Sequence, residues 1–210
     1  MNIFLIGIFV LTLMAVTAKR ITALVNGFML QSLFLFLMTL TAAVTSKENE
    51  LYIIALLVLV LKVVLIPYFL KWIARKIKIE EGLGLYINPI LSLLIVIVLS
   101  YGAYMFSRNI MGIQNRVETA SFAISLSVLL TGLFIMVFRM KALAQVTGLL
   151  IMENGLFLAA VELCGNMPFF VEIAIFFDVF VFAVIIGIFV FRINELFAHI
   201  DVDKLTTLKG

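Results

Sequence analysis

Long apolar runs separated by short polar connections occupy almost the whole of this sequence. A helix needs about 20 apolar residues to cross the hydrocarbon core of a bilayer. These runs are long and continuous, whereas the strands of a membrane barrel would be short and alternating. We therefore predict about seven transmembrane helices, at residues 2–18, 21–45, 51–71, 87–106, 119–138, 142–163 and 169–191.

The composition argues against a soluble globule. Of the 210 residues, 65% are hydrophobic and 13% are charged, while about a quarter of an average soluble domain is charged. A small soluble domain keeps much of its surface in water, and this sequence has too few polar residues to cover such a surface. We expect an all-α integral membrane protein with almost no soluble part.

Basic residues are distributed unevenly between the two sides of the predicted bundle. Cytoplasmic loops of membrane proteins are enriched in Lys and Arg. The bias predicts an outside N-terminus and a cytoplasmic C-terminus, which requires an odd number of helices. The first run is followed by its basic residues, so we interpret it as a retained helix and not a signal peptide. The predicted cytoplasmic side holds Lys19, Arg20, Lys71, Arg75, Lys76, Lys78, Arg139, Lys141, Arg192, Lys204 and Lys209, and the other side holds Lys47, Arg108 and Arg116.

Two longer polar connections, at 73–86 and 107–118, divide the predicted helices into a 3+1+3 arrangement. The sequence thus predicts an N-terminal three-helix unit at 1–80, a bridging helix with its loops at 81–115, and a C-terminal three-helix unit with a short tail at 116–210. Residues 20–35 and 139–158 are faintly alike, through either an old duplication or chance.

Four ionisable residues fall within the predicted spans: Lys62, Glu153, Glu172 and Asp178. Each charge costs roughly 2.5–3.5 kcal/mol at the centre of a membrane helix on insertion scales. A helix that only had to reside in lipid would carry leucine at these positions. We therefore interpret all four as candidate proton-relay residues.

Glu153 is the strongest of these candidates because it lies in the middle of its run, in the segment Gly148-Leu-Leu-Ile-Met-Glu-Asn-Gly155. Burial disfavours the charged form of a carboxylate, so that it can bind and release a proton near neutral pH. Asn154 can hydrogen-bond a partner helix, and the two glycines allow another backbone to approach closely. The alternative is an ion pair with a neighbouring subunit that serves assembly.

The other three candidates differ in depth and surroundings. Asp178 lies among phenylalanines near the middle of the last run, whereas Glu172 is nearer its outer end and about 120° around the helix; an interfacial position is the alternative for Glu172. Lys62 is too deep for easy snorkelling. Pro67 would free the carbonyl of Val63 and kink the helix just beyond the lysine. A proton path and a salt bridge to another subunit both remain open for Lys62.

Neutral polar residues within the runs are interpreted as interhelical glue; they include Asn26, Gln31, Ser32, Gln145 and Thr147. With one cysteine, Cys164, and one histidine, His199, the chain alone cannot form a disulfide, an iron–sulfur cluster, or a zinc or haem site. The basic residues lie at the ends of apolar runs, which is no nucleic-acid-binding pattern. We expect no cofactor bound by this chain and no nucleic-acid partner.

Three segments carry recognisable motifs: LKVVLIP at 61–67 with ARK at 74–76, LIMENG at 150–155, and VEIAIFFD at 171–178 continuing into FAVI at 182–185. Together with the tail at 200–210, they resemble component E of the hydrogenase-4 type complexes, also called the second formate hydrogenlyase. The last three predicted helices are also similar to the K-type subunit of respiratory complex I. Glu153 would match one carboxylate of that subunit, displaced by one turn from Leu150, and Asp178 would match a second.

The resemblance implies a non-catalytic, multi-pass subunit of an energy-converting, formate hydrogenlyase-like complex in the inner (cytoplasmic) membrane. Its partners would be antiporter-like and quinone-reductase-like membrane subunits and soluble hydrogenase subunits. The NiFe centre and iron–sulfur clusters would lie in those soluble partners, and buried charges would serve proton or sodium translocation coupled to electron transfer. The alternatives are a structural scaffold without its own ion path, an Mrp-type cation/proton antiporter subunit, or an autonomous secondary transporter.

Overall fold

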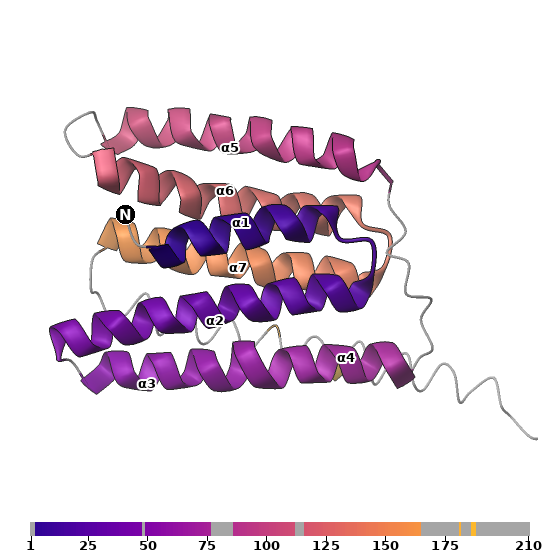
Figure 1. Ribbon diagram of the computed structural model, residues 1–210, viewed down its shortest axis with the longest axis horizontal. Coiled ribbons are helices and arrows are strands. Elements are labelled where there is room, and N and C mark those ends of the chain that lie inside the picture. Colours follow the sequence, from indigo (N-terminus) through magenta and orange to yellow (C-terminus); the bar gives the residue numbers. More distant parts are fainter. Residues whose placement is uncertain are drawn as a thin grey trace, which may run out of the picture.

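The computed structural model describes residues 3–47, 49–76, 86–111, 116–164, 181 and 186–187. The regular structure of these residues is entirely helical, as the sequence predicts. The helices lie side by side along one direction (Figure 1). They are α1 (Ile3–Thr17), α2 (Ile21–Ser46), α3 (Asn49–Val58), the π-helical segment η1 (Leu59–Leu65), α4 (Ile66–Lys76), α5 (Pro89–Met111), α6 (Arg116–Phe138) and α7 (Ala142–Cys164).

Five helical stretches among the described residues are long and apolar enough to cross a membrane: Ile21–Thr45, Asn49–Lys76, Pro89–Asn109, Glu118–Phe138 and Ala142–Ala160. The second of these joins α3, η1 and α4 into one span. The remaining apolar helix, α1, has 15 residues and is shorter than the others. The chain is therefore a multi-pass helical protein. The predicted seventh span, at 169–191, lies almost wholly outside the described residues, and the count of seven stays a prediction.

The ends of the helices follow from local sequence. Pro89 is the first residue of α5, where its missing N–H removes no helical hydrogen bond. The side chain of Asn88 caps this helix by accepting a hydrogen bond from the Ile90 N–H at 3.2 Å. At the other end of the bundle, α2 stops at Lys47, which adopts a left-handed conformation with φ 56° and donates its N–H to the Ala43 carbonyl.

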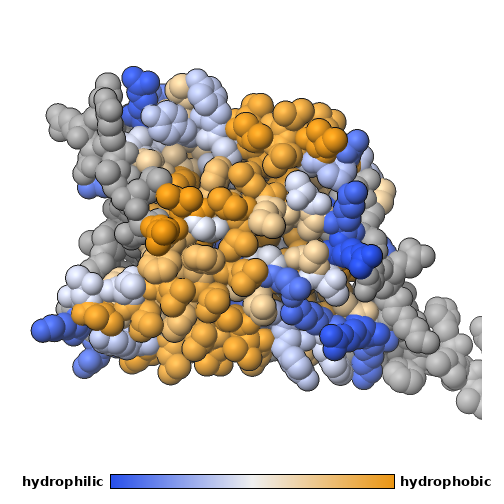
Figure 2. All heavy atoms as spheres, in the orientation of Figure 1, coloured by the Kyte–Doolittle hydropathy of each residue, from blue (hydrophilic) through white to orange (hydrophobic). Residues whose placement is uncertain are grey.

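Polarity is distributed as expected for a protein dissolved in lipid. Figure 2 shows an apolar belt around the middle of the helices, with hydrophilic residues gathered towards their two ends. On α5, the exposed side chains include Leu94, Ile97 and Val98. The buried residues include charged and amide side chains, among them Lys62 and Glu153. These two charged side chains are therefore sheltered between helices and kept from lipid.

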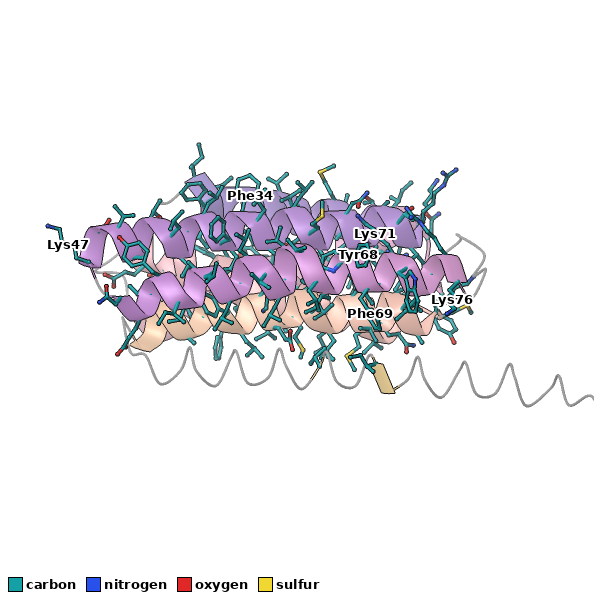
Figure 3. All side chains as sticks on the ribbon, turned by 90° about the horizontal axis from the view of Figure 1, so that it is seen from below. Phe34, Lys47, Tyr68, Phe69, Lys71 and Lys76 are labelled. Atoms are coloured by element: carbon teal, nitrogen blue, oxygen red, sulfur yellow. The ribbon has the colours of Figure 1, made fainter. Side chains whose placement is uncertain are left out.

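One end of the bundle carries most of the described basic residues. The α1–α2 connection, the α6–α7 connection and the end of α4 lie at this end (Figure 1). Figure 3 shows Lys71 and Lys76 towards it and Lys47 at the opposite end. The Lys76 ammonium lies 4.7 Å from the centroid of the Trp72 ring, a cation–π contact typical of a membrane interface. Which side of the membrane this end faces stays a prediction.

Helices α6 and α7 pack most closely, and glycines make this possible. A Cβ atom on Gly155 would collide with the backbone of Leu129, and one on Gly132 with the backbone of Met152. A Cβ atom on Gly148 would lie 2.7 Å from the backbone nitrogen of Met136. The close approach expected of Gly148 and Gly155 is thus made to α6, and it sets the position of the intervening residues of α7.

Candidate functional site

Two buried charges of opposite sign, Lys62 and Glu153, meet between η1 and α7. Lys62 is 2% exposed and Glu153 is 4% exposed. The Lys62 Nζ atom lies 3.9 Å from Oε2 of Glu153. Both residues are near the middle of their spans, Asn49–Lys76 and Ala142–Ala160. The structure therefore places an ammonium and a carboxylate of the same chain together at mid-depth in the membrane.

Asn154 also contacts the lysine. Its Oδ1 atom accepts a hydrogen bond of 3.1 Å from the Lys62 Nζ atom. Because Asn154 directly follows Glu153, the lysine reaches two successive residues of one helix. The ammonium thus has a neutral acceptor at hydrogen-bond distance and a carboxylate slightly farther away, beyond the 2.7–2.9 Å usual for a charge-assisted bond.

From Asn154, buried hydrogen bonds continue through α2 into α1. The Asn154 Nδ2 atom donates to Gln31 Oε1 at 3.3 Å and lies 3.4 Å from the acceptor Ser32 Oγ. Gln31 Nε2 donates to Thr12 Oγ1 at 2.7 Å, and the Thr12 hydroxyl donates to the Ile8 carbonyl at 2.7 Å. We call Lys62, Asn154, Gln31 and Thr12 the polar chain. It crosses four helical segments, and α2 packs against both η1 and α7.

Only some of the neutral polar residues expected to join helices form hydrogen bonds across helices in the described part of the chain. Gln31 and Ser32 bind across helices, as predicted. Thr147 donates within its own helix to Leu143, and Asn26 is exposed. We did not predict from the sequence that Thr12 bonds to another helix. The available signal was a hydroxyl in the middle of the run 2–18.

Lys62 occupies the centre of the π-helical segment Leu59–Leu65. The Ile66 N–H bonds to the Leu61 carbonyl, five residues back, and Pro67 follows immediately. Proline has no N–H, so the preceding turn cannot complete its α-helical ladder. The disturbance expected near Lys62 therefore takes the form of a widened helical turn, a feature frequent at functional sites.

A second buried basic residue, Arg139, lies between α6 and α7 and is 3% exposed. Its Nη2 atom donates to the Val16 carbonyl at 2.6 Å, near the end of α1. Burial lowers the pKa of the guanidinium to about 10, so Arg139 stays charged at neutral pH. From the sequence, Arg139 is interpreted only as a topology signal. In the structure, its side chain joins α1 to the α6–α7 connection.

Comparison with known proteins places these residues in a family. Hydrogenase-4 component E of Escherichia coli K12 is 30% identical to this chain over 210 residues, covering 98% of the chain and 96% of the relative. This chain belongs to the hydrogenase-4 component E family. The family's protein from Shigella flexneri matches equally well, and an uncharacterized protein of Mycobacterium tuberculosis is 25% identical over 207 residues, or 97% of this chain and 93% of its own length. No protein-family model and no solved structure matches.

In this member of the component E family, two of the segments that carry the resemblance meet in space. The segment 61–67 contributes Lys62, and the segment 150–155 contributes Glu153 and Asn154. The third segment holds Glu172 and Asp178, which lie outside the described residues, so their predicted role is untested. Within the described ranges, no three His, Cys, Asp or Glu residues gather as metal ligands would.

Proposed function

We propose that this chain is a non-catalytic membrane subunit of a hydrogenase complex, and that its Lys62–Glu153 pair takes part in proton translocation coupled to electron transfer. The name of its Escherichia coli relative, a hydrogenase-4 component, supports membership of such a complex. The NiFe centre and iron–sulfur clusters would then lie in soluble hydrogenase partners. Antiporter-like and quinone-reductase-like subunits would be its neighbours in the cytoplasmic membrane.

The observation that carries this proposal is the 3.9 Å separation of a buried ammonium and a buried carboxylate at mid-membrane depth. Taking charges out of water is costly, and a buried ion pair is often no more stabilising than apolar residues of similar volume. Selection for stability alone therefore gives no reason to keep this pair. Movement of protons does, because both groups change charge by one proton.

The pair can pass on a proton in two balanced steps. A proton that reaches Glu153 neutralises its carboxylate and removes this negative charge from beside the Lys62 ammonium, which favours transfer of a Lys62 proton to a base of a neighbouring subunit. The proton then moves from the Glu153 carboxyl to the neutral amine and restores the ion pair. One proton has entered at Glu153 and one has left from Lys62.

Asp178 would be a further station, and Glu172 a peripheral one. Asp178 lies in a predicted span with phenylalanines on both sides in sequence. The similarity of the last three predicted helices to the K-type subunit of complex I supports pairing it with Glu153 in one path. This extension rests on sequence alone.

Glu153→Gln in the intact complex tests the proposal. Glutamine has the shape of glutamate but holds no exchangeable acid proton. We expect assembly and dye-linked hydrogenase activity to be retained, because Lys62 keeps its hydrogen bond to Asn154. Proton pumping into inverted vesicles should fall about 100-fold or more, a typical size for loss of a proton-transfer group. The exposed Glu50 on α3 provides the matched control, Glu50→Gln. Pumping at the wild-type rate in assembled Glu153→Gln would disprove the relay.

A further inference from the structure

We infer that Thr12 is a positioning residue for the Lys62–Glu153 pair: it sets the direction of the polar chain, so that Asn154 presents its oxygen and not its amide nitrogen to Lys62. The inference rests on the proposed function of the pair and adds a residue on α1, 50 positions before the lysine in sequence. Thr12 contacts Gln31, and its effect on Lys62 passes through two amides.

A backbone carbonyl sets the direction of the hydrogen bonds in the polar chain. The Ile8 oxygen can only accept, and the Thr12 hydroxyl has a single hydrogen, which it donates to this oxygen at 2.7 Å. The Thr12 oxygen then has only lone pairs left for its other neighbour. Gln31 must therefore turn its NH₂ group towards Thr12, as it does at 2.7 Å.

Each later link follows from the one before. Because the Gln31 nitrogen donates to Thr12, its Oε1 atom faces α7. Asn154 must therefore donate to this oxygen from Nδ2, as it does at 3.3 Å. The Oδ1 atom of Asn154 is thereby aimed at η1, where it accepts from Lys62 at 3.1 Å. If the chain ran the other way, the NH₂ group of Asn154 would face the ammonium, donor against donor.

This orientation places an acceptor oxygen, and not a donor, against the Lys62 Nζ atom. A hydrogen bond to a charged group is stronger than one between neutral groups, and aligned hydrogen bonds in a low-dielectric interior polarise one another. The two amides do not titrate, so protons do not leave Lys62 along the chain towards α1. The polar chain holds the ammonium in place, and the proton that Lys62 releases leaves by a route other than the polar chain towards α1.

The test compares three substitutions of buried threonines in the intact complex. Thr12→Val keeps the shape but removes the hydroxyl. We expect proton pumping to fall about 3- to 10-fold, the range of one net hydrogen bond between neutral groups, with assembly and dye-linked activity retained. Thr12→Ser restores the hydroxyl and should restore pumping. Thr39→Val is the matched control. Among the residues that the structure describes, the buried Thr39 hydroxyl bonds only within α2, to Leu35, at 3.0 Å.

A double-substitution cycle tests the route through Gln31. In a Gln31→Leu background the chain is already broken, so adding Thr12→Val should reduce pumping no further. Independent losses from the two substitutions would overturn the inference. If Thr12→Val prevents assembly, Thr12→Ala removes the same hydroxyl without the branched methyl, and the same comparison with serine applies.

The outcomes separate this inference from the proposed function. Wild-type pumping in Thr12→Val, together with lost pumping in Glu153→Gln, would refute the role of Thr12 and leave the relay standing. Wild-type pumping in both variants would refute both. A loss in Thr12→Val that serine does not rescue would show a packing effect and also overturn the inference.

Discussion

The Nζ atom of Lys62 lies 3.1 Å from the Oδ1 atom of Asn154, although 92 positions separate the two residues in sequence. This hydrogen bond joins the widened turn of η1 to the middle of α7, beside Glu153. It connects the lysine to Gln31 and Thr12 on two further helices. The bond therefore joins the ion pair to the polar chain that orients it.

Removing Lys62 alone should be more harmful than removing both charges of the ion pair. Lys62→Met leaves the Glu153 carboxylate buried without its counter-charge, which typically costs about 3–5 kcal/mol. We expect little assembled complex on blue-native gels for this variant. The double variant Lys62→Met with Glu153→Gln has no buried charge at this site and should assemble again while failing to pump protons.

The same double variant distinguishes a relay from a scaffold. Under the scaffold hypothesis the pair serves assembly alone, so an assembled double variant would pump like the wild type. Lys71→Met is a suitable control because it removes a lysine from the same span, at the basic end of α4.

Substitution of Gly155 should displace the site through the backbone. A Cβ atom at this position would meet the backbone of Leu129, which cannot turn aside as a side chain can. Gly155→Ala should separate α6 from α7 and destabilise the protein by about 1–3 kcal/mol or more. Thermal unfolding in detergent measures this loss.

The control for Gly155 is Gly102→Ala on α5, where nothing lies within 4 Å of the added carbon. Its melting temperature should equal that of the wild type or rise slightly, because alanine favours the helix. Equal melting temperatures for Gly155→Ala and the wild type would contradict the close packing of α6 on α7.

Arg139→Ala should destabilise the protein by about 2–4 kcal/mol, since it leaves a cavity and removes the donor of the Val16 carbonyl. The exposed Lys19→Ala should change stability by about 0.5 kcal/mol or less. Unfolding of the purified chain in nanodiscs, followed by circular dichroism, compares the two. A loss no larger than that of Lys19→Ala would show that the buried guanidinium does not join α1 to the α6–α7 connection.

The pKa of Arg139 adds a pH condition to that comparison. Burial lowers this pKa to about 10, so the folded state releases the proton more readily than the unfolded state does. The penalty for burying the charge is fully present below about pH 10 and declines as the pH rises above this value. Between about pH 6 and pH 8 the effect of Arg139→Ala should therefore be constant.

The sequence alone was sufficient to predict apolar helices long enough to cross a membrane. It also predicted that Lys62 and Glu153 lie within two of these helices. Both follow from the solvent: lipid cannot bond to backbone groups, which demands helices, and it disfavours charge, which makes a buried lysine conspicuous. Pro67 likewise predicted a disturbed helix beside Lys62, because the absence of its N–H follows from the residue type alone. Family membership was recognisable from the segments 61–67 and 150–155.

Only the tertiary structure decided which groups meet. That Lys62 reaches both Glu153 and Asn154, that Thr12 anchors a chain of amides, and that Arg139 is buried against Val16 depend on how the helices are rotated and which ones are neighbours. The apolar faces of these helices are alike in composition, so hydrophobic patterning does not specify their rotation. Close contacts at Gly132, Gly148 and Gly155, together with the need of each buried donor for an acceptor, select one arrangement, and both act between residues far apart in the chain.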